Sequence, residues 1–258
     1  DISDYQDIDP MFGTLEDMEE LIRKAKDHGI RIIMDLVVNH TSTEHAWFKE
    51  SRADKDNPKR DFYVWRPPFE GGVPNGERSI FSGSAWEKDE ATGEYYLHMF
   101  AKEQPDLNWE NEKLRQKLYE MINWWLDKGL AGFRIDAIIN IRKDLQFKSL
   151  PADGDDGFVH AGVAAEKVPG IGDMLEDLKK NTFEKYDAFT VAEVFNMRKD
   201  ELREFIGDNG HFSTMFDFSA ECLAFGGHGW YDAPEITFED YRRVIFHSQR
   251  ECEDVGFM

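Results

Sequence analysis

Two hydrophobic periods alternate along this chain. Apolar residues at helical spacing in Leu15–His28, stopped by Gly29, predict an amphipathic helix, and the apolar run Ile30–Val38 behind it predicts a buried strand. The same pair of patterns recurs three times. The further predicted helices are Glu112–Lys128, Ile171–Lys185 and Lys199–Ile206, and the strands that follow them are Gly132–Ile138, Phe189–Phe195 and Thr214–Phe218.

Alternating helices and strands of this length predict an α/β fold with a parallel sheet and helices outside it. The periodicity leaves open whether the sheet is doubly wound or closed into a barrel. Between His40 and Gln104 the chain is rich in Pro, Gly, aromatic and charged residues and lacks a helical period. Because a structureless loop of that length is unusual, we expect a small inserted subdomain over the mouth of the site.

Three acids occupy equivalent places, since Asp35, Asp136 and Glu193 each lie late in a predicted strand. A charge in a buried strand must be paired or must emerge at the strand end. Each acid alone could be a structural carboxylate held by backbone groups or an arginine. Three successive strands that end this way favour a barrel, where the carboxyl ends carry the chemistry, over an open sheet with a single switch point.

Composition excludes several classes of partner. The 258 residues are 41% hydrophobic, enough for a sizeable core, and 52 Asp and Glu against 31 Lys and Arg give a net charge of −21. This charge argues against binding to nucleic acid or to an anionic membrane. Two cysteines without CxxC spacing are typical of ordinary thiols in a reducing compartment, and no apolar run of about 18 residues occurs. We therefore expect a cytoplasmic protein.

The acids and their neighbours indicate two-carboxylate glycoside chemistry. Arg134 lies two residues before Asp136, so a strand places both side chains on one face, where the cation would keep the aspartate ionised and nucleophilic. Glu193 is then the acid, and its apolar neighbours should raise its pKa. His40 could donate a hydrogen bond to a sugar hydroxyl, or could be a capping or core residue.

Metal chemistry finds little support in the sequence. No HExxH motif occurs, and neither His40 nor His45 has carboxylate or thiolate partners at a ligand spacing. The acidic stretch Pro151–Gly157 lacks EF-hand spacing and is interpreted as a solvated loop. We expect no metal site and no cofactor.

Four segments together resemble signature motifs of the α-amylase family of glycoside hydrolases. They are DLVVNH (Asp35–His40), QPDLN (Gln104–Asn108), GFRIDAIIN (Gly132–Asn140) and AEVFN (Ala192–Asn196). The QPDLN form, with HAWFKESR and RDFYVWR, is most similar to the branch that holds oligo-1,6-glucosidases, α-glucosidases, dextran glucosidases and sucrose isomerases.

The resemblance implies a (β/α)8 TIM barrel with an inserted domain B after strand 3. The corresponding division is residues 1–40 for helix 2 and strand 3, 41–105 for domain B, and 106–258 for helix 3 to the start of strand 7. By motif, Asp136 resembles the nucleophile and Glu193 the general acid/base. Residues that resemble the family's glucose-contacting or pocket-lining positions are Asp35, His40, Phe81, Phe100, Gln104 and Arg134.

The implied function is that of a retaining, exo-acting α-glucosidase on short malto- or isomalto-oligosaccharides, in a monomer or small homo-oligomer. In this branch Val after the nucleophile goes with α-1,6 preference, whereas Ala or Thr goes with acceptance of α-1,4 bonds, so Ala137 predicts activity on maltose-type links. The alternatives are a transglycosylating sucrose isomerase or glucosyltransferase, and a non-catalytic sugar-binding or transport-associated relative. Retention of both acids and Arg134 argues against the last.

One departure from the family pattern is large. The family's third carboxylate lies in an NHD motif at the seventh strand, and this sequence ends at DVGFM. We therefore expect a fragment holding about strands 3 to 6, inactive on its own because open edges leave the pocket half built. Any targeting signal or structural calcium site would lie in the missing parts.

Overall fold

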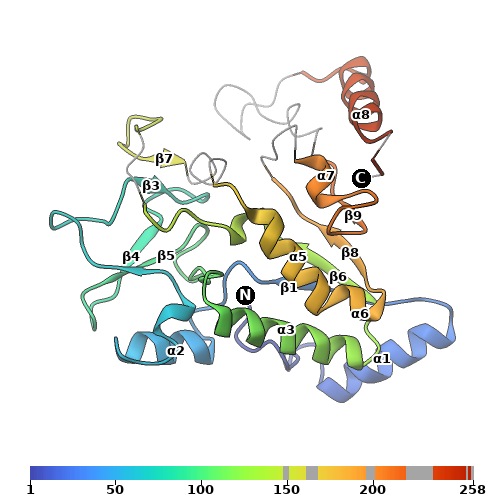
Figure 1. The fold of residues 1–258 in the computed structure, drawn as a ribbon, viewed down its shortest axis with the longest axis horizontal. Coiled ribbons are helices and arrows are strands. Elements are labelled where there is room, and N and C mark those ends of the chain that lie inside the picture. Colours follow the sequence, from blue (N-terminus) through green and yellow to red (C-terminus); the bar gives the residue numbers. More distant parts are fainter. Residues whose placement is uncertain (148–150, 161–167, 196–200, 219–234, 254, 257–258) are drawn as a thin grey trace.

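A four-stranded parallel sheet forms the centre of the computed structural model, which describes residues 1–147, 151–160, 168–195, 201–218, 235–253 and 255–256 (Figure 1). The strand order is β1-β6-β8-β9. This α/β arrangement confirms the predicted class, and it fits part of a (β/α)8 barrel. The strands are β1 (Ile33–Val37), β6 (Gly132–Asp136), β8 (Phe189–Ala192) and β9 (Thr214–Met215).

Capping side chains and glycines set the ends of the helices that precede the first three strands. Thr14 caps the first helix through a reciprocal capping box, and Asn111 accepts a hydrogen bond at the start of the second. Gly29 and Gly129 follow these helices at φ of 73° and 92°, a conformation that favours glycine. The helices are α1 (Leu15–Asp27), α3 (Glu112–Asp127) and α5 (Ile171–Asn181).

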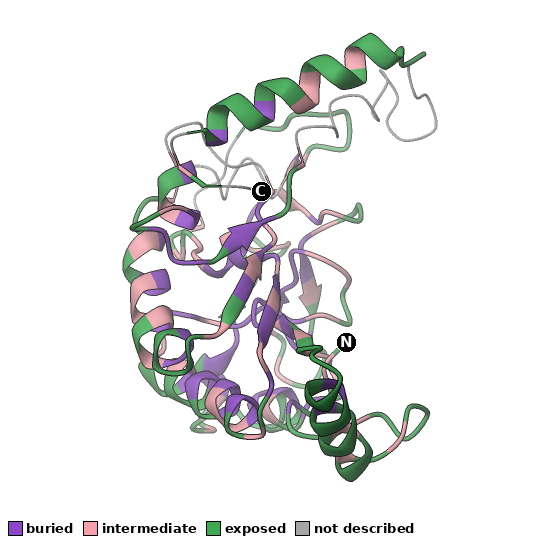
Figure 2. Cartoon of the chain, turned by 90° about the vertical axis from the view of Figure 1, so that its right-hand side faces the viewer, coloured by how far each residue is buried: buried purple, intermediate pink, exposed green. Residues whose placement is uncertain are grey.

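The two faces of the sheet differ in chemistry. Phe133 and Ile135 of β6 are buried in one apolar core with residues of α3 and α5. Buried residues of the helices face the sheet (Figure 2). The intervening residues Arg134 and Asp136 point to the opposite face, and the register places Asp35 of β1 beside Arg134. Packing against the helices therefore uses one face. The other, called the polar face below, carries the charged residues beside apolar ones such as Val37 and Val191.

The sheet corrects the predicted strand bounds. Ile30 was expected to start the first strand, but its N–H donates to Ala25 O at 2.8 Å, so it closes the end of α1. The strand also is not buried on both faces, because Ile33 and Asp35 are exposed. The other predicted strands extend beyond the observed β6, β8 and β9, since each chain leaves the sheet at its carboxyl end.

The helix prediction needs similar corrections. The expected helix Ile171–Lys185 breaks at Thr182 into α5 and α6 (Phe183–Tyr186), and α7 is limited to Leu202–Phe205, residues 196–200 being outside the described part. Helix α8 (Phe238–Cys252) was not predicted. It ends at Cys252, a buried free thiol, whereas Cys222 lies outside the described residues.

The insertion has its own secondary structure, and its two ends pair with each other. Thr41 N–H donates to Pro105 O at 3.2 Å, and Leu107 N–H donates to Asn39 O at 2.9 Å. The bounds of domain B at residues 41 and 105 stay a prediction. One helix was missed, because eight residues carry too little periodic signal. The elements are α2 (Ala46–Ala53), the 3₁₀ turn η1 (Arg60–Phe62), β2 (Trp65–Arg66), β3 (Glu77–Arg78), β4 (Trp86–Lys88) and β5 (Tyr95–Leu97), with β2-β5-β4 antiparallel.

The aromatic rings of the insertion mostly join the main core. Rings such as Tyr63, Trp65 and Tyr96 are buried in the same cluster as the sheet and helices. Only a small second cluster, which includes Trp86, is separate among the described residues. The insertion is thereby packed firmly against the barrel part.

The acidic stretch after β6 is held by an arginine. Strand β3 pairs in parallel with β7 (Val159–His160), and Arg78 of β3 forms ion pairs with Asp153 at 2.8 Å and Asp156 at 2.6 Å. These acids thus fasten a second connection to the insertion. They do more than the solvated loop we expected.

Candidate active site

Arg134 is the centre of the polar face of the sheet. Its Nη1 lies 2.8 Å from Asp35 Oδ1 and 2.7 Å from Asp136 Oδ1, and its Nη2 contacts Glu193 Oε1. One guanidinium therefore joins carboxylates from β1, from β6 and from the residue after β8. The three acids predicted from their equivalent strand positions are brought together.

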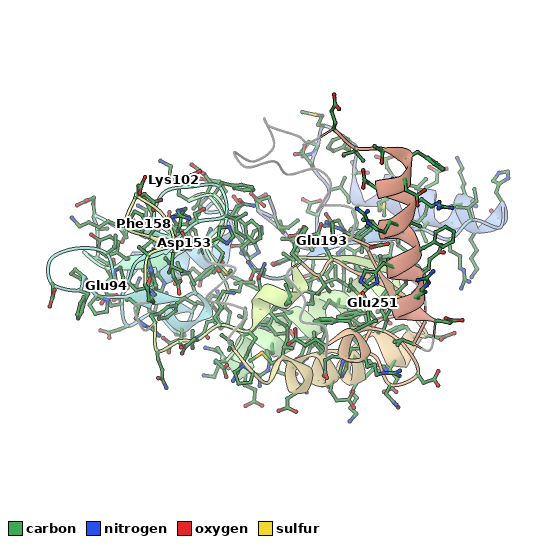
Figure 3. The ribbon with its side chains drawn as sticks, turned by 90° about the horizontal axis from the view of Figure 1, so that it is seen from above. Glu94, Lys102, Asp153, Phe158, Glu193 and Glu251 are labelled. Carbon is green, nitrogen blue, oxygen red and sulfur yellow. The ribbon has the colours of Figure 1, made fainter. Side chains whose placement is uncertain are left out.

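Backbone geometry at the ends of β6 and β8 fixes the two inner acids. Ala137 turns the chain out of β6 in the left-handed conformation, at φ 43° and ψ 37°. This turn directs its N–H to Glu193 Oε2 at 3.1 Å. Glu193 in turn donates its own N–H to Ile135 O at 3.0 Å. Seen from above, Glu193 lies between the insertion, with Glu94 and Lys102, and helix α8, with Glu251 (Figure 3).

The surroundings of Glu193 and Arg134 shift the pKa values of both groups. Burial raises the pKa of Glu193, and the neighbouring Asp136 raises it further, whereas the Ala137 N–H and Arg134 lower it. The predicted direction for Glu193 is confirmed. Burial alone would lower the pKa of Arg134, but its bonds to Asp35 and Asp136 raise it well above its ordinary value, so the guanidinium stays charged.

Arg134 has more partners than the sequence predicts. We assigned Arg134 to Asp136 alone and used that pairing to distinguish nucleophile from acid. Because Arg134 also contacts Glu193, its charge does not distinguish the two acids. The remaining difference is burial: the side chain of Glu193 is 13% exposed and that of Asp136 is 24% exposed.

A second group surrounds His40 at the junction of β1 and the insertion. His40 Nε2 lies 3.0 Å from Gln104 Nε2, and the His40 ring centroid is 5.3 Å from that of Phe100. Phe100 in turn meets Phe81, with centroids 5.8 Å apart, and Phe81 is 64% exposed. Burial lowers the pKa of His40, while Asp106 and Asp136 oppose the effect, so His40 is neutral near pH 7.

The predicted residues therefore fall into two adjoining groups, and their assigned roles stay predictions. Asp35 differs from expectation, because its side chain is 57% exposed and Arg134 is its ion-pair partner. Sequence reasoning missed Phe216, whose ring centroid lies 5.7 Å from Arg134 Cζ. Its place just after β9 follows the same rule that found the acids. The sequence also did not predict Lys143, which contacts Asn39 beside His40 and belongs to no recognisable motif.

Geometry and sequence together define the class of protein. The family model described as alpha amylase, catalytic domain, matches residues 1–258, and the chain belongs to this family. It is 49% identical over 261 residues to the probable oligo-1,6-glucosidase 3 of Bacillus subtilis strain 168, covering 100% of this chain and 46% of that protein.

Solved structures agree with this assignment. The chain superposes on a mutant of the trehalulose synthase MutB with TM-score 0.92 and 38% identity, and on the trehalose-6-phosphate hydrolase TreA of Bacillus licheniformis with TM-score 0.89 and 36% identity. Each match covers 99% of this chain and 46% of the other. The chain thus spans about half the length of the relatives it matches.

Two further findings concern the described residues. None of their helices is both long and apolar enough to cross a membrane. Among the same residues, no three or more His, Cys, Asp and Glu side chains group in a way that could hold a metal ion.

Proposed function

We propose that the protein containing this chain is a retaining, exo-acting α-glucosidase that hydrolyses α-1,4 or α-1,6 bonds of short malto- and isomalto-oligosaccharides. The main support for this proposal is that Asp136 and Glu193 contact neighbouring nitrogens of the Arg134 guanidinium. The chain spans about half the length of its relatives, so the activity is proposed for the whole protein.

The separation of the acids supports retention of configuration. Two carboxylates bound to adjacent nitrogens of one guanidinium are only a few Å apart. Retaining enzymes hold their carboxyl groups about 5 to 5.5 Å apart, whereas inverting enzymes need about 6.5 to 9.5 Å to admit a water. The contact of both acids with one guanidinium therefore favours the shorter separation of a retaining enzyme.

The chemistry then divides between the two acids. Asp136 attacks the anomeric carbon while Glu193, whose protonated form is favoured by burial, gives its proton to the departing glycosidic oxygen. Glu193 then takes a proton from a water molecule whose oxygen bonds to the anomeric carbon, and the bond to Asp136 breaks to release glucose. Arg134, Asp35 and His40 bind the glucose in this proposal. The insertion residues Phe81, Phe100 and Gln104 line the pocket beside them, and Ala137 leaves room for the leaving sugar.

The test is an assay of the whole protein on maltose and isomaltose, with the anomer of the first released glucose followed by proton NMR. We expect the α anomer, and Ala137 predicts that maltose is accepted. Asp136→Asn and Glu193→Gln should each lower kcat at least about 10²-fold without unfolding the protein, whereas the exposed control Glu90→Gln should match wild type. Release of β-glucose, or undiminished activity in both site variants, contradicts the proposal.

A sucrose isomerase is the second candidate, supported by the close superposition on trehalulose synthase. Such an enzyme shares the glycosyl-transfer step but passes glucose to fructose and excludes water. Incubation with sucrose distinguishes them: glucose and fructose indicate hydrolysis, and an isomeric disaccharide indicates isomerisation. A non-catalytic sugar-binding protein would bind these sugars and release none of these products.

The remaining properties are proposals of the same kind. We infer that catalysis needs no metal or cofactor, which is tested by assay after exhaustive chelation. A cytoplasmic location and a monomer or small homo-oligomer complete the proposal. Cell fractionation and light scattering of the whole protein test these two points.

A further inference from the structure

Behind His40 lies a buried polar group that the proposed mechanism does not use. Asn39 and Asp106 are fully buried, and the side chain of Lys143 is 6% exposed. Lys143 Nζ donates to Asn39 Oδ1 at 2.8 Å and to Asn140 O at 2.7 Å, and it lies 3.3 Å from Asp106 Oδ2. A buried ammonium is costly unless paired in this way, so its partners are tightly constrained.

The charges on either side determine how the Asn39 amide is oriented. Its oxygen faces the Lys143 ammonium, and its nitrogen donates to Asp106 Oδ1 at 3.4 Å. Rotating the amide by 180° would place its N–H groups against the ammonium and its oxygen against the carboxylate. Because the ammonium is donor-only and an ionised carboxylate is acceptor-only, the observed orientation is the one that both can bind.

This orientation has a consequence for the His40 ring. Asn39 Nδ2 lies 3.2 Å from His40 Nδ1, so an N–H group of Asn39 is directed at that nitrogen. Nδ1 must then accept a hydrogen bond and carry no proton. A neutral imidazole has one N–H, which is left for Nε2. An acceptor for it is present, since Asp1 Oδ1 lies 3.3 Å from Nε2.

We propose that Lys143 is a positioning residue that acts through Asn39 to hold His40 in the tautomer with its proton on Nε2. His40 then offers a hydrogen-bond donor to a ligand hydroxyl on the side of Gln104 and Phe100. The part of this inference that concerns a sugar hydroxyl rests on the proposed function. The part that concerns the tautomer does not.

One contact favours the opposite tautomer. Gln104 Oε1 accepts from Ala101 N–H at 2.8 Å, so the Gln104 amino group faces His40 Nε2 at 3.0 Å. The Asn39 side prevails for two reasons. Asn39 is fully buried and held between two charges, whereas Gln104 is partly exposed and can shift. The Asp1 carboxylate also accepts from Gln104 Nε2, at 2.9 Å, and draws that amino group toward itself.

The test begins with neutron diffraction from perdeuterated crystals of the whole protein. We expect deuterium on His40 Nε2 and none on Nδ1. Deuterium on Nδ1 with Nε2 bare would overturn the proposal, whatever the enzyme acts on. If deuterium is on Nε2 but the protein has no glucosidase activity, the tautomer stands and the proposed function fails.

Two variants test whether Lys143 and Asn39 cause this state. Asn39→Asp replaces the N–H at Nδ1 with a carboxylate oxygen, so the deuterium should move to Nδ1. Lys143→Met frees the Asn39 amide and should give a mixture of tautomers. Each should lower kcat/KM about tenfold or more. Unchanged deuterium positions in both variants would refute the relay.

A matched control separates positioning from loss of stability. Arg60 is also a nearly buried cation, paired with Glu94 and bonded to Ser51 O at 2.9 Å, but it lies in the insertion without contact to His40. Arg60→Met should lower the melting temperature while leaving the His40 tautomer and kcat/KM as in wild type. If Arg60→Met reduces kcat/KM as much as Lys143→Met, Lys143 acts through stability alone and the proposal is wrong.

Discussion

Replacement of Arg134 by Met removes the cation that Asp35, Asp136 and Glu193 share. Three carboxylates are then left close together on one face of the sheet, without the guanidinium that offsets their repulsion. Since the side-chain stem is retained in Met, packing changes little. The consequences should therefore be electrostatic.

The expected loss follows from the contacts. A hydrogen bond to a charged group contributes about 1.5 to 3 kcal/mol, and two of the Arg134 contacts, to Asp136 and Glu193, involve the reacting pair. The Arg134 side chain is 25% exposed, which favours the lower end, about 3 kcal/mol in total. At about 1.4 kcal/mol per factor of ten, kcat/KM should fall about 10²-fold. Arg134→Lys, which keeps the charge but cannot bridge three acids, should fall less, about tenfold.

The pH profile gives the sign. Arg134 lowers the pKa of Glu193, so its removal must raise that pKa further. Glu193 acts as an acid and must be protonated, so activity persists to higher pH in the variant. The alkaline limb of kcat/KM against pH should shift upward in Arg134→Met and stay in place in the exposed control Lys88→Met. An unshifted or downward-shifted limb, or a loss of less than about threefold, would show the reasoning to be wrong.

Three further outcomes are expected for the whole protein. Burial raises the pKa of Glu77 from 4.5 to about 6, so between these pH values the folded protein holds a proton that the unfolded protein releases. The free energy of unfolding, measured with urea, should therefore fall by about 2 kcal/mol as the pH rises through this range. In Glu77→Gln this dependence of the unfolding free energy on pH should be weaker. Gly132→Ala should cost more than about 3 kcal/mol, because its Cβ would lie 1.8 Å from Phe189 O, whereas Gly72→Ala, with nothing closer than 3.7 Å, should be near neutral in the same denaturation assay. Ala137→Val puts a branched residue at φ 43°, so the free energy of unfolding should fall by about 1 to 3 kcal/mol and the melting temperature with it. The ratio of maltose to isomaltose hydrolysis should also decrease. A ratio equal to that of wild type would contradict the proposed role of Ala137.

The alternation of helical and strand-like hydrophobic patterns predicted the parallel sheet. The position of each acid late in a predicted strand predicted the site. Asp136 and Arg134 share a face because side chains alternate along a strand, which depends on nothing beyond local geometry. Helix α3 was found because sixteen residues carry a strong periodic signal, and Gly129 marks its end. These are local properties, so a single sequence contains them.

What the sequence did not predict depends on contacts between distant segments. The pairing of Arg134 with Glu193 joins residues 59 positions apart, and that of Lys143 with Asn39 joins residues 104 positions apart. The pairing of β3 with β7 joins the insertion to a later connection in the same way. Such partners depend on the tertiary structure, and the hydrophobic periodicity of the sequence does not indicate them.

In the proposed mechanism Asp136 forms a covalent bond to glucose while Glu193 serves as acid and base. Its most direct test is to trap the intermediate on the whole protein with 5-fluoro-α-D-glucosyl fluoride and to locate the added mass by peptide mass spectrometry. We expect a single labelled peptide that contains Asp136, and no label in Asp136→Asn. A label on Glu193, or active turnover of the reagent with no glycosylated peptide, would contradict it.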